Sequence, residues 1–369
     1  MTEDEGGIRP PSSRLTGADS LRAVATVAVV VIHTSAWGPT STYTNTALLA
    51  RFSVPAFMVL TGLLLAYRYT GRPLGTDFAR ARLARTLVPW LVWIPVFLVL
   101  DLWPMQMLPQ DGGQVAQWVA EGGGHLWYLL LIPQFYVLFA RWPQRHTVAI
   151  AAGALLLQTG LGLWRLYGPL PAGPVQTLVL QYGYLLFPFW IGYFAVGVAL
   201  GRNWRMLRRS GRAAVASAGA AATLVAGWLL VTITFAEAPY VTFLNGTGAF
   251  LDPVLPLLVF SIAALVMSAT PPLMQRSSLL RNVTRTVSDN SLGIYIIHPI
   301  VLFYLGTYTQ QWLYASIGTS VAWFLIDVAG SVLGSLAATR LITATPLAPI
   351  VGVSRRGLFP LHRAVRSHR

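Results

Sequence analysis

The chain has no cysteine, and all 26 of its basic residues are arginine. The absence of cysteine excludes disulfide bonds and thiolate chemistry, so no cysteine nucleophile is available. Charged residues make up only 10% of the 369 positions, whereas hydrophobic residues make up 55%. That balance leaves too little polar surface to cover a soluble globule, and it indicates a polytopic membrane protein.

Apolar runs of roughly 16 to 25 residues, the length that crosses a bilayer, recur along the sequence. They lie at Ala18–Trp37, Leu48–Tyr67, Leu87–Leu102, Leu126–Ala140, Thr147–Trp164, Tyr182–Leu200, Ala213–Phe235, Phe250–Met267, Leu292–Tyr308 and Leu313–Ala338. We therefore expect an all-α transmembrane bundle of about ten helices. It would form one membrane domain over residues 18–341, between a cytoplasmic N-terminal segment (1–17) and an arginine-rich cytoplasmic tail (342–369) that lies against anionic lipid headgroups.

The net charge of +14 could suggest a nucleic-acid partner until the arginines are placed along the chain. They gather in alternate loops, while the intervening loops hold Asp111, Glu121 and Glu237, with Arg165 as one basic exception. The positive-inside rule then predicts that both termini are cytoplasmic. The excess charge is thus a topology signal, and no nucleic-acid partner is expected.

Two ionisable side chains share the first apolar run. His33 lies within Ala18–Trp37, and Arg22 lies eleven positions before it. Eleven positions at about 100° each complete roughly three turns, which puts both side chains on one helix face about 16 Å apart. An ionisable group at this depth costs roughly 2.5 to 3.5 kcal/mol, so it marks a functional interior by default. A neutral imidazole, with its ordinary pKa of about 6.5, suits a general base that activates a hydroxyl.

Structural alternatives remain for both residues. His33 could be a packing imidazole that is hydrogen-bonded to a neighbouring helix. Arg22 could be a membrane anchor that pairs with Asp19 at i, i+3 spacing.

Further candidates lie elsewhere in the chain. His298 falls within the ninth run, three positions after Tyr295 and on its face, where a structural hydrogen bond is as well supported as a role in the site. His125 begins the fourth run at the outer surface, and Trp127 beside it fits the aromatic belt of a membrane protein. None of these histidines has an acid at ligand spacing, so we expect no metal site.

Four local patterns recur together in this sequence. They are Asp19-Ser20-Leu21-Arg22 with His33, Phe52–Phe57 running into Leu60–Leu64, His125–Leu129, and Ser288–Pro299. In this order, and over essentially the whole chain, the set resembles the acyltransferase 3 family of integral membrane O-acyltransferases. The resemblance implies about ten transmembrane helices. It also implies transfer of an acyl group, usually acetyl from acetyl-CoA, to hydroxyls of sugars and related envelope or secreted molecules.

The resemblance also assigns residues. Its arginine and histidine in the first helix fall on Arg22 and His33, and its Arg-x-x-Arg element for acyl-CoA falls on Arg82 and Arg85, with Arg80 upstream. Planar guanidinium groups suit the phosphates of coenzyme A, although without the resemblance these arginines would be ordinary topology charges.

The sequence thus predicts an O-acyltransferase of the plasma membrane that uses acyl-CoA and no metal. His33, Arg22 and Asp19 would be catalytic, and the acceptor would be an envelope glycan, a glycolipid or a secreted metabolite. A separate extracytoplasmic partner could complete transfer. The alternative is a transporter or flippase of envelope lipids or polysaccharides, because a polar cavity in a ten-helix bundle would serve transport equally well.

Overall fold

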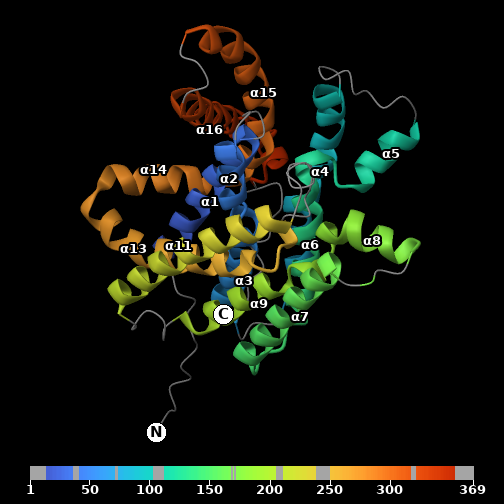
Figure 1. Cartoon of the computed structure of the whole chain (residues 1–369), viewed down its shortest axis with the longest axis vertical. Coiled ribbons are helices and arrows are strands. Elements are labelled where there is room, and N and C mark those ends of the chain that lie inside the picture. The colour runs from blue at the N-terminus through green and yellow to red at the C-terminus, as the bar shows by residue number, and fades with distance from the viewer. Residues whose placement is uncertain are drawn as a thin grey trace, which may run out of the picture.

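The computed structural model describes residues 14–35, 41–70, 74–102, 112–167, 169, 172–204, 211–237, 250–316 and 321–353, and its regular structure over these residues is helical (Figure 1). The α-helices are α1 (Thr16–Ser35), α2 (Ser41–Ala50), α3 (Ser53–Tyr69), α4 (Thr76–Leu102), α5 (Gly112–Ala120), α6 (Tyr128–Ala140), α7 (Thr147–Tyr167), α8 (Pro174–Tyr182), α9 (Ile191–Arg202), α11 (Arg212–Glu237), α13 (Leu255–Arg276), α14 (Ser278–Asp289), α15 (Ser291–Ser316) and α16 (Val321–Thr343). Short 3-10 turns are η1 (Gly124–Trp127), η2 (Gly183–Leu185), η3 (Phe187–Phe189) and η5 (Ala348–Val351).

The helices confirm an all-α, multi-pass membrane protein. In the described residues, 7 helices are long and apolar enough to cross a membrane, and up to 9 spans result if each of two bent helix pairs counts as one. α9 is a shorter apolar helix. The predicted run Tyr182–Leu200 is not one helix, because η2 and η3 break it at Gly183 and Pro188 before α9 begins. The predicted start of the last run, Leu313, lies instead inside α15.

The inner helices of the bundle are α1 and α3. The surrounding protein buries 61% of the most apolar stretch of α1 and 78% of that of the span over 45–69, against 17% to 28% for the other five unbroken spans. α1 contacts α2, α3, α13, α14, α15 and α16, and Figure 1 shows it in the middle of the molecule. A side chain on α1 can therefore meet residues from distant parts of the chain.

Glycines allow α3 and α9 to pack backbone against backbone. A Cβ atom at Gly62 would lie 2.2 Å from the carbonyl oxygen of Phe194, and one at Gly197 would lie 2.1 Å from that of Val59. Small residues at helix interfaces permit such close approach in membranes, where packing replaces the hydrophobic effect as the main driving force. This contact fixes the helix that carries Leu60 and Thr61.

A glycine turn carries the chain from α5 into η1. Gly122, Gly123 and Gly124 all have positive φ angles, of 97°, 73° and 60°, which side chains with a Cβ rarely adopt. The indole Nε1 of Trp90 donates a hydrogen bond to the carbonyl oxygen of Gly122 at 3.0 Å. The turn bends the path by 46° and directs the residues after it into the bundle.

The basic segment Arg276–Arg285, which lies between two of the predicted apolar runs, contains most of helix α14. Ser277 caps its N-terminus, because its side chain accepts a hydrogen bond from the backbone N–H of Leu280. Arg281 and Arg285 make the helix too polar to appear as an apolar run. α14 meets α15 at a bend of 79° (Figure 1).

Candidate active site

Three histidines from distant elements lie together. The ring centroid of His33 is 4.9 Å from that of His298 and 6.2 Å from that of His125, and the last two are 5.7 Å apart. His33 sits in the last turn of α1. The glycine turn places the His125 ring beside α15 and the other two histidines.

Backbone carbonyls fix the proton on two of these rings. His298 Nδ1–H donates to the carbonyl oxygen of Tyr295 at 2.8 Å and to that of Ile294 at 3.2 Å. His125 Nε2–H donates to the carbonyl oxygen of Ile296 at 3.2 Å. In a neutral imidazole the other nitrogen then carries a lone pair. His298 is fully buried, and its Nε2 has no hydrogen-bond partner among the described residues.

A second hydrogen bond, donated by Tyr295 of α15, joins α15 to η1. The Tyr295 hydroxyl donates a hydrogen bond to the carbonyl oxygen of His125, while His125 donates to the carbonyl oxygen of Ile296. The two bonds join the same short segments, so they hold the His125 ring against α15.

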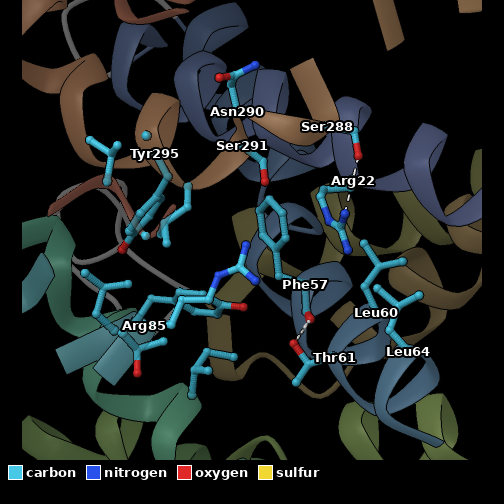
Figure 2. A pocket seen from close by; sticks show the side chains of 18 of the residues that line it. Arg22, Phe57, Leu60, Thr61, Leu64, Arg85, Ser288, Asn290, Ser291 and Tyr295 are labelled. Carbon is cyan, nitrogen blue, oxygen red and sulfur yellow. Dashed lines mark hydrogen bonds between the residues drawn. The ribbon is translucent and has the colours of Figure 1, made fainter. Parts of the chain in front are cut away.

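A cavity of about 310 Å³ lies between residues of α1, α3, α4, α6 and α15 (Figure 2). Four arginines line it: Arg22, Arg68, Arg82 and Arg85. Figure 2 shows Arg22 and Arg85 approaching it from two different helices, α1 and α4. Phe57, Leu60 and Leu64 of α3 supply an apolar wall. The cavity therefore combines a high density of positive charge with a surface for an uncharged group.

Aromatic rings surround Arg82. Its guanidinium carbon lies 5.8 Å from each of the ring centroids of Tyr69, Phe78 and Tyr136, and its Nη2 donates to the hydroxyl of Tyr69 at 3.3 Å. Such contacts stabilise a planar cation electrostatically. Arg80 is exposed and does not line the cavity, so the structure does not join it to the other arginines.

Two phenol rings stand between the cavity and the histidines. Tyr128 and Tyr295 both line the cavity, and their ring centroids are 5.8 Å apart. The ring of Tyr295 also lies 5.6 Å from that of His125 and 6.3 Å from that of His298. None of the three histidines lines the cavity itself. One layer of aromatic side chains thus separates the arginine-lined space from the histidine cluster.

Asp19 belongs to a charged network beside the cavity. Arg14 Nε and Ser288 Oγ both donate to its carboxylate, the latter at 3.3 Å, and Arg22 Nη1 lies 3.9 Å from it. Arg14 also pairs with Asp289 at 2.6 Å, and these two carboxylates raise the pKa of the Arg14 guanidinium above its ordinary value. Asp19 is 6% exposed and does not line the cavity, so its contacts are those of a residue that positions Arg22.

Trp127 is buried, which overturns its expected place in a surface aromatic belt. Its ring centroid lies 5.4 Å from those of Tyr184 and Trp190 and 5.8 Å from that of Phe250. These aromatic rings pack around Trp127 and so stabilise η1. Throughout the described residues, histidines and acids form no group that could hold a metal ion.

Sequence reasoning missed Arg68 and Tyr136 as cavity residues. Arg68 ends α3 and was one of several arginines in a basic segment, with nothing to single it out. Tyr136 lies two helical turns after Tyr128 on α6, so their shared face was a usable signal.

One known protein family matches most of the chain. The acyltransferase 3 family model, described as an acyltransferase domain, matches residues 15–340. The chain belongs to this family. It is therefore a membrane acyltransferase, and the family match covers the histidine cluster and the four arginines that line the cavity. No curated protein and no solved structure matches the chain.

Proposed function

We propose that this acyltransferase moves an acyl group, usually acetyl in its family, from acyl-CoA to a hydroxyl of an envelope glycan, a glycolipid or a secreted metabolite. One observation carries the proposal. Four arginines line a single cavity whose inner wall, Tyr295, contacts the histidine cluster. Family membership favours this enzyme over a transporter, since a transporter needs no acyl donor.

The donor occupies the arginine-lined cavity. Arg68, Arg82 and Arg85 bind the phosphates of coenzyme A, because guanidinium groups form strong, charge-assisted hydrogen bonds to phosphate oxygens. The pantetheine arm extends along Phe57 and Leu60 toward the two phenol rings. Transfer requires the thioester to pass Tyr128 and Tyr295.

His33 acts as the general base. Its imidazole takes the proton of the acceptor hydroxyl, and the oxygen attacks the thioester carbonyl. The carbon–sulfur bond then breaks, and the coenzyme A thiolate takes the proton back from the imidazolium. The reaction leaves an ester and a free thiol, with no net proton released.

The neighbouring residues support His33. The lone pair on His298 Nε2 accepts the second N–H of the His33 imidazolium, in the way that a third group orients the base of a catalytic triad. Arg22 lies about three helical turns before His33 on α1 and stabilises charge on the donor, while Asp19 positions Arg22. The acceptor approaches from the opposite end of α1, at the outer face of the plasma membrane, where a separate extracytoplasmic partner would deliver or receive it.

The decisive experiment replaces His33 by alanine in the purified enzyme. We expect His33→Ala to abolish acyl transfer, measured as thiol release from acetyl-CoA with acceptor material from the envelope, and to leave expression and membrane insertion near normal. General-base loss typically costs about 10² to 10⁴ in rate. His298→Ala should cause a smaller loss.

His146→Asn is the matched control. His146 is exposed and has a φ of 55°, a conformation that asparagine tolerates. The His146→Asn variant should retain wild-type activity. Wild-type acyl transfer by His33→Ala would reject the base assignment, and an active His33→Ala beside a stable, inactive His298→Ala would move the base to α15.

A further inference from the structure

The chain returns to the cavity after its last long helix. α16 ends at Thr343, and the turn η5 (Ala348–Val351) follows it. Ala348 and Val351 are 0% and 1% exposed, so this segment is part of the core. It packs against α4, α15 and α16. It lies beyond residue 340, where the family match ends.

Specific hydrogen bonds fix this segment. The indole Nε1 of Trp93 in α4 donates to the carbonyl oxygen of Ile350 at 2.9 Å. Within the turn, the backbone N–H of Gly352 donates to the carbonyl oxygen of Pro349 at 3.0 Å, and that of Val353 to Ala348 at 3.1 Å. The segment is therefore held both to itself and to the helix that carries Arg82 and Arg85.

Three consecutive residues of the segment, Val351, Gly352 and Val353, line the arginine-bearing cavity. Gly352 has a φ of 73°, and a Cβ atom there would lie 2.2 Å from Leu292 Cδ2 and 3.5 Å from the carbonyl oxygen of Arg85. Leu292 and Arg85 line the cavity too. The positive φ favours glycine at this position, and a larger residue would require the Leu292 side chain to move.

We propose that residues 351–353 are donor-binding residues that cover the uncharged part of acyl-CoA beside the phosphate-binding arginines. This inference rests on the proposed function of the cavity. Val351, Val353 and Leu292 form an apolar surface next to Arg85, which matches a ligand that carries phosphates at one end and an uncharged arm beside them. Removal of that surface from water favours binding. A segment outside the matched family domain thus completes the donor site.

Ligand protection of single cysteines tests the assignment directly. The chain has no cysteine of its own, so a maleimide modifies only an introduced thiol. We would compare Val353→Cys, Ser291→Cys on another wall of the cavity, and Ala344→Cys, which is exposed nearby and does not line it. The probe is desulfo-coenzyme A, which has no thiol to react with the maleimide.

We expect desulfo-coenzyme A at about ten times its Kd to slow modification of Val353→Cys and Ser291→Cys about tenfold, and to leave Ala344→Cys unchanged. Protection at 291 without protection at 353 would overturn this inference and leave the cavity as the donor site. Protection at neither position would overturn both.

Kinetics give a second measurement. Gly352→Ala introduces a Cβ at a positive φ and against Leu292, so we expect a severalfold higher KM for acetyl-CoA with little change in kcat. The control is Gly160→Ala, since a Cβ at Gly160 would meet no atom within 4 Å. An unchanged KM in Gly352→Ala would count against the proposal.

Discussion

Arg82 and Arg85, which both line the cavity, differ in their surroundings. Arg82 lies among three aromatic rings, which suit a flat, delocalised cation better than the compact ammonium of lysine. Arg85 is exposed toward the cavity, with its donors available to a ligand. Both can form two parallel hydrogen bonds to one phosphate, which lysine cannot do.

Lysine at these positions should therefore weaken donor binding. We expect Arg82→Lys and Arg85→Lys each to weaken acetyl-CoA binding by about 1 kcal/mol or more, because the charge remains while the paired hydrogen bonds are lost. Equilibrium binding to the purified enzyme measures the change. Arg80→Lys is the matched control, since Arg80 is exposed on the same helix and does not line the cavity. Wild-type affinity in the Arg82→Lys, Arg85→Lys double variant would make these arginines topology charges.

Single residues could be predicted where the bilayer makes them conspicuous. Arg22 and His33 stood out because ionisable groups are costly within an apolar run. The meeting of His33 with His125 could not be predicted, because it depends on three consecutive positive φ angles between Gly122 and Gly124. Their sequence signal, a run of glycine, equally predicts a flexible surface turn.

At the level of the helix, the contact between α3 and α9 governs the position of the cavity wall. α3 supplies Phe57, Leu60 and Thr61 to the cavity, and on another face its Gly62 meets the backbone of α9. An added methyl group there would contact backbone atoms, which cannot rotate away as a side chain can.

Gly62→Ala should therefore destabilise the protein. Overpacking typically costs about 1 to 3 kcal/mol, and a backbone contact of 2.2 Å places this site toward the upper end. Thermal unfolding in detergent measures the change. Gly153→Ala is the control, because a Cβ at Gly153 meets no atom within 4 Å and alanine favours a helix. Equal unfolding temperatures for the two variants would mean that α3 and α9 do not pack this closely.

Apolar runs predicted most of the long helices, because length and hydrophobicity are what a bilayer selects. They failed where a helix is polar or interrupted. α14 is helical through its capping serine and its packing on α1 and α13, and neither appears in a hydropathy pattern. The run before α9 is apolar enough for a span, yet Gly183 and Pro188 divide it.

At the scale of the molecule, several charged residues that the structure describes gather at one end of the bundle, the arginine-bearing end. The cavity with Arg68 and Arg85 opens there, and the same end holds the Arg14–Asp289 pair and Arg340, which donates to Thr286 Oγ1 at 3.3 Å. The positive-inside rule predicts that this end faces the cytoplasm. Coenzyme A carries charged phosphates, and charged groups cross a hydrocarbon layer only at high cost. The donor that we propose, acyl-CoA, would therefore reach the enzyme from the arginine-bearing side.

Sealed vesicles of opposite orientation test this asymmetry. With acetyl-CoA added outside, inside-out vesicles should release thiol and acetylate the acceptor, because they expose the arginine-bearing end. Right-side-out vesicles should stay inactive until detergent permeabilises them, after which both preparations should reach the same rate. Maleimide labelling of Ala344→Cys, which lies at the same end, reports the orientation of each preparation independently. Equal rates in both sealed preparations, with orientation verified by that label, would show that the donor enters from either side and would contradict a cytoplasmic donor cavity.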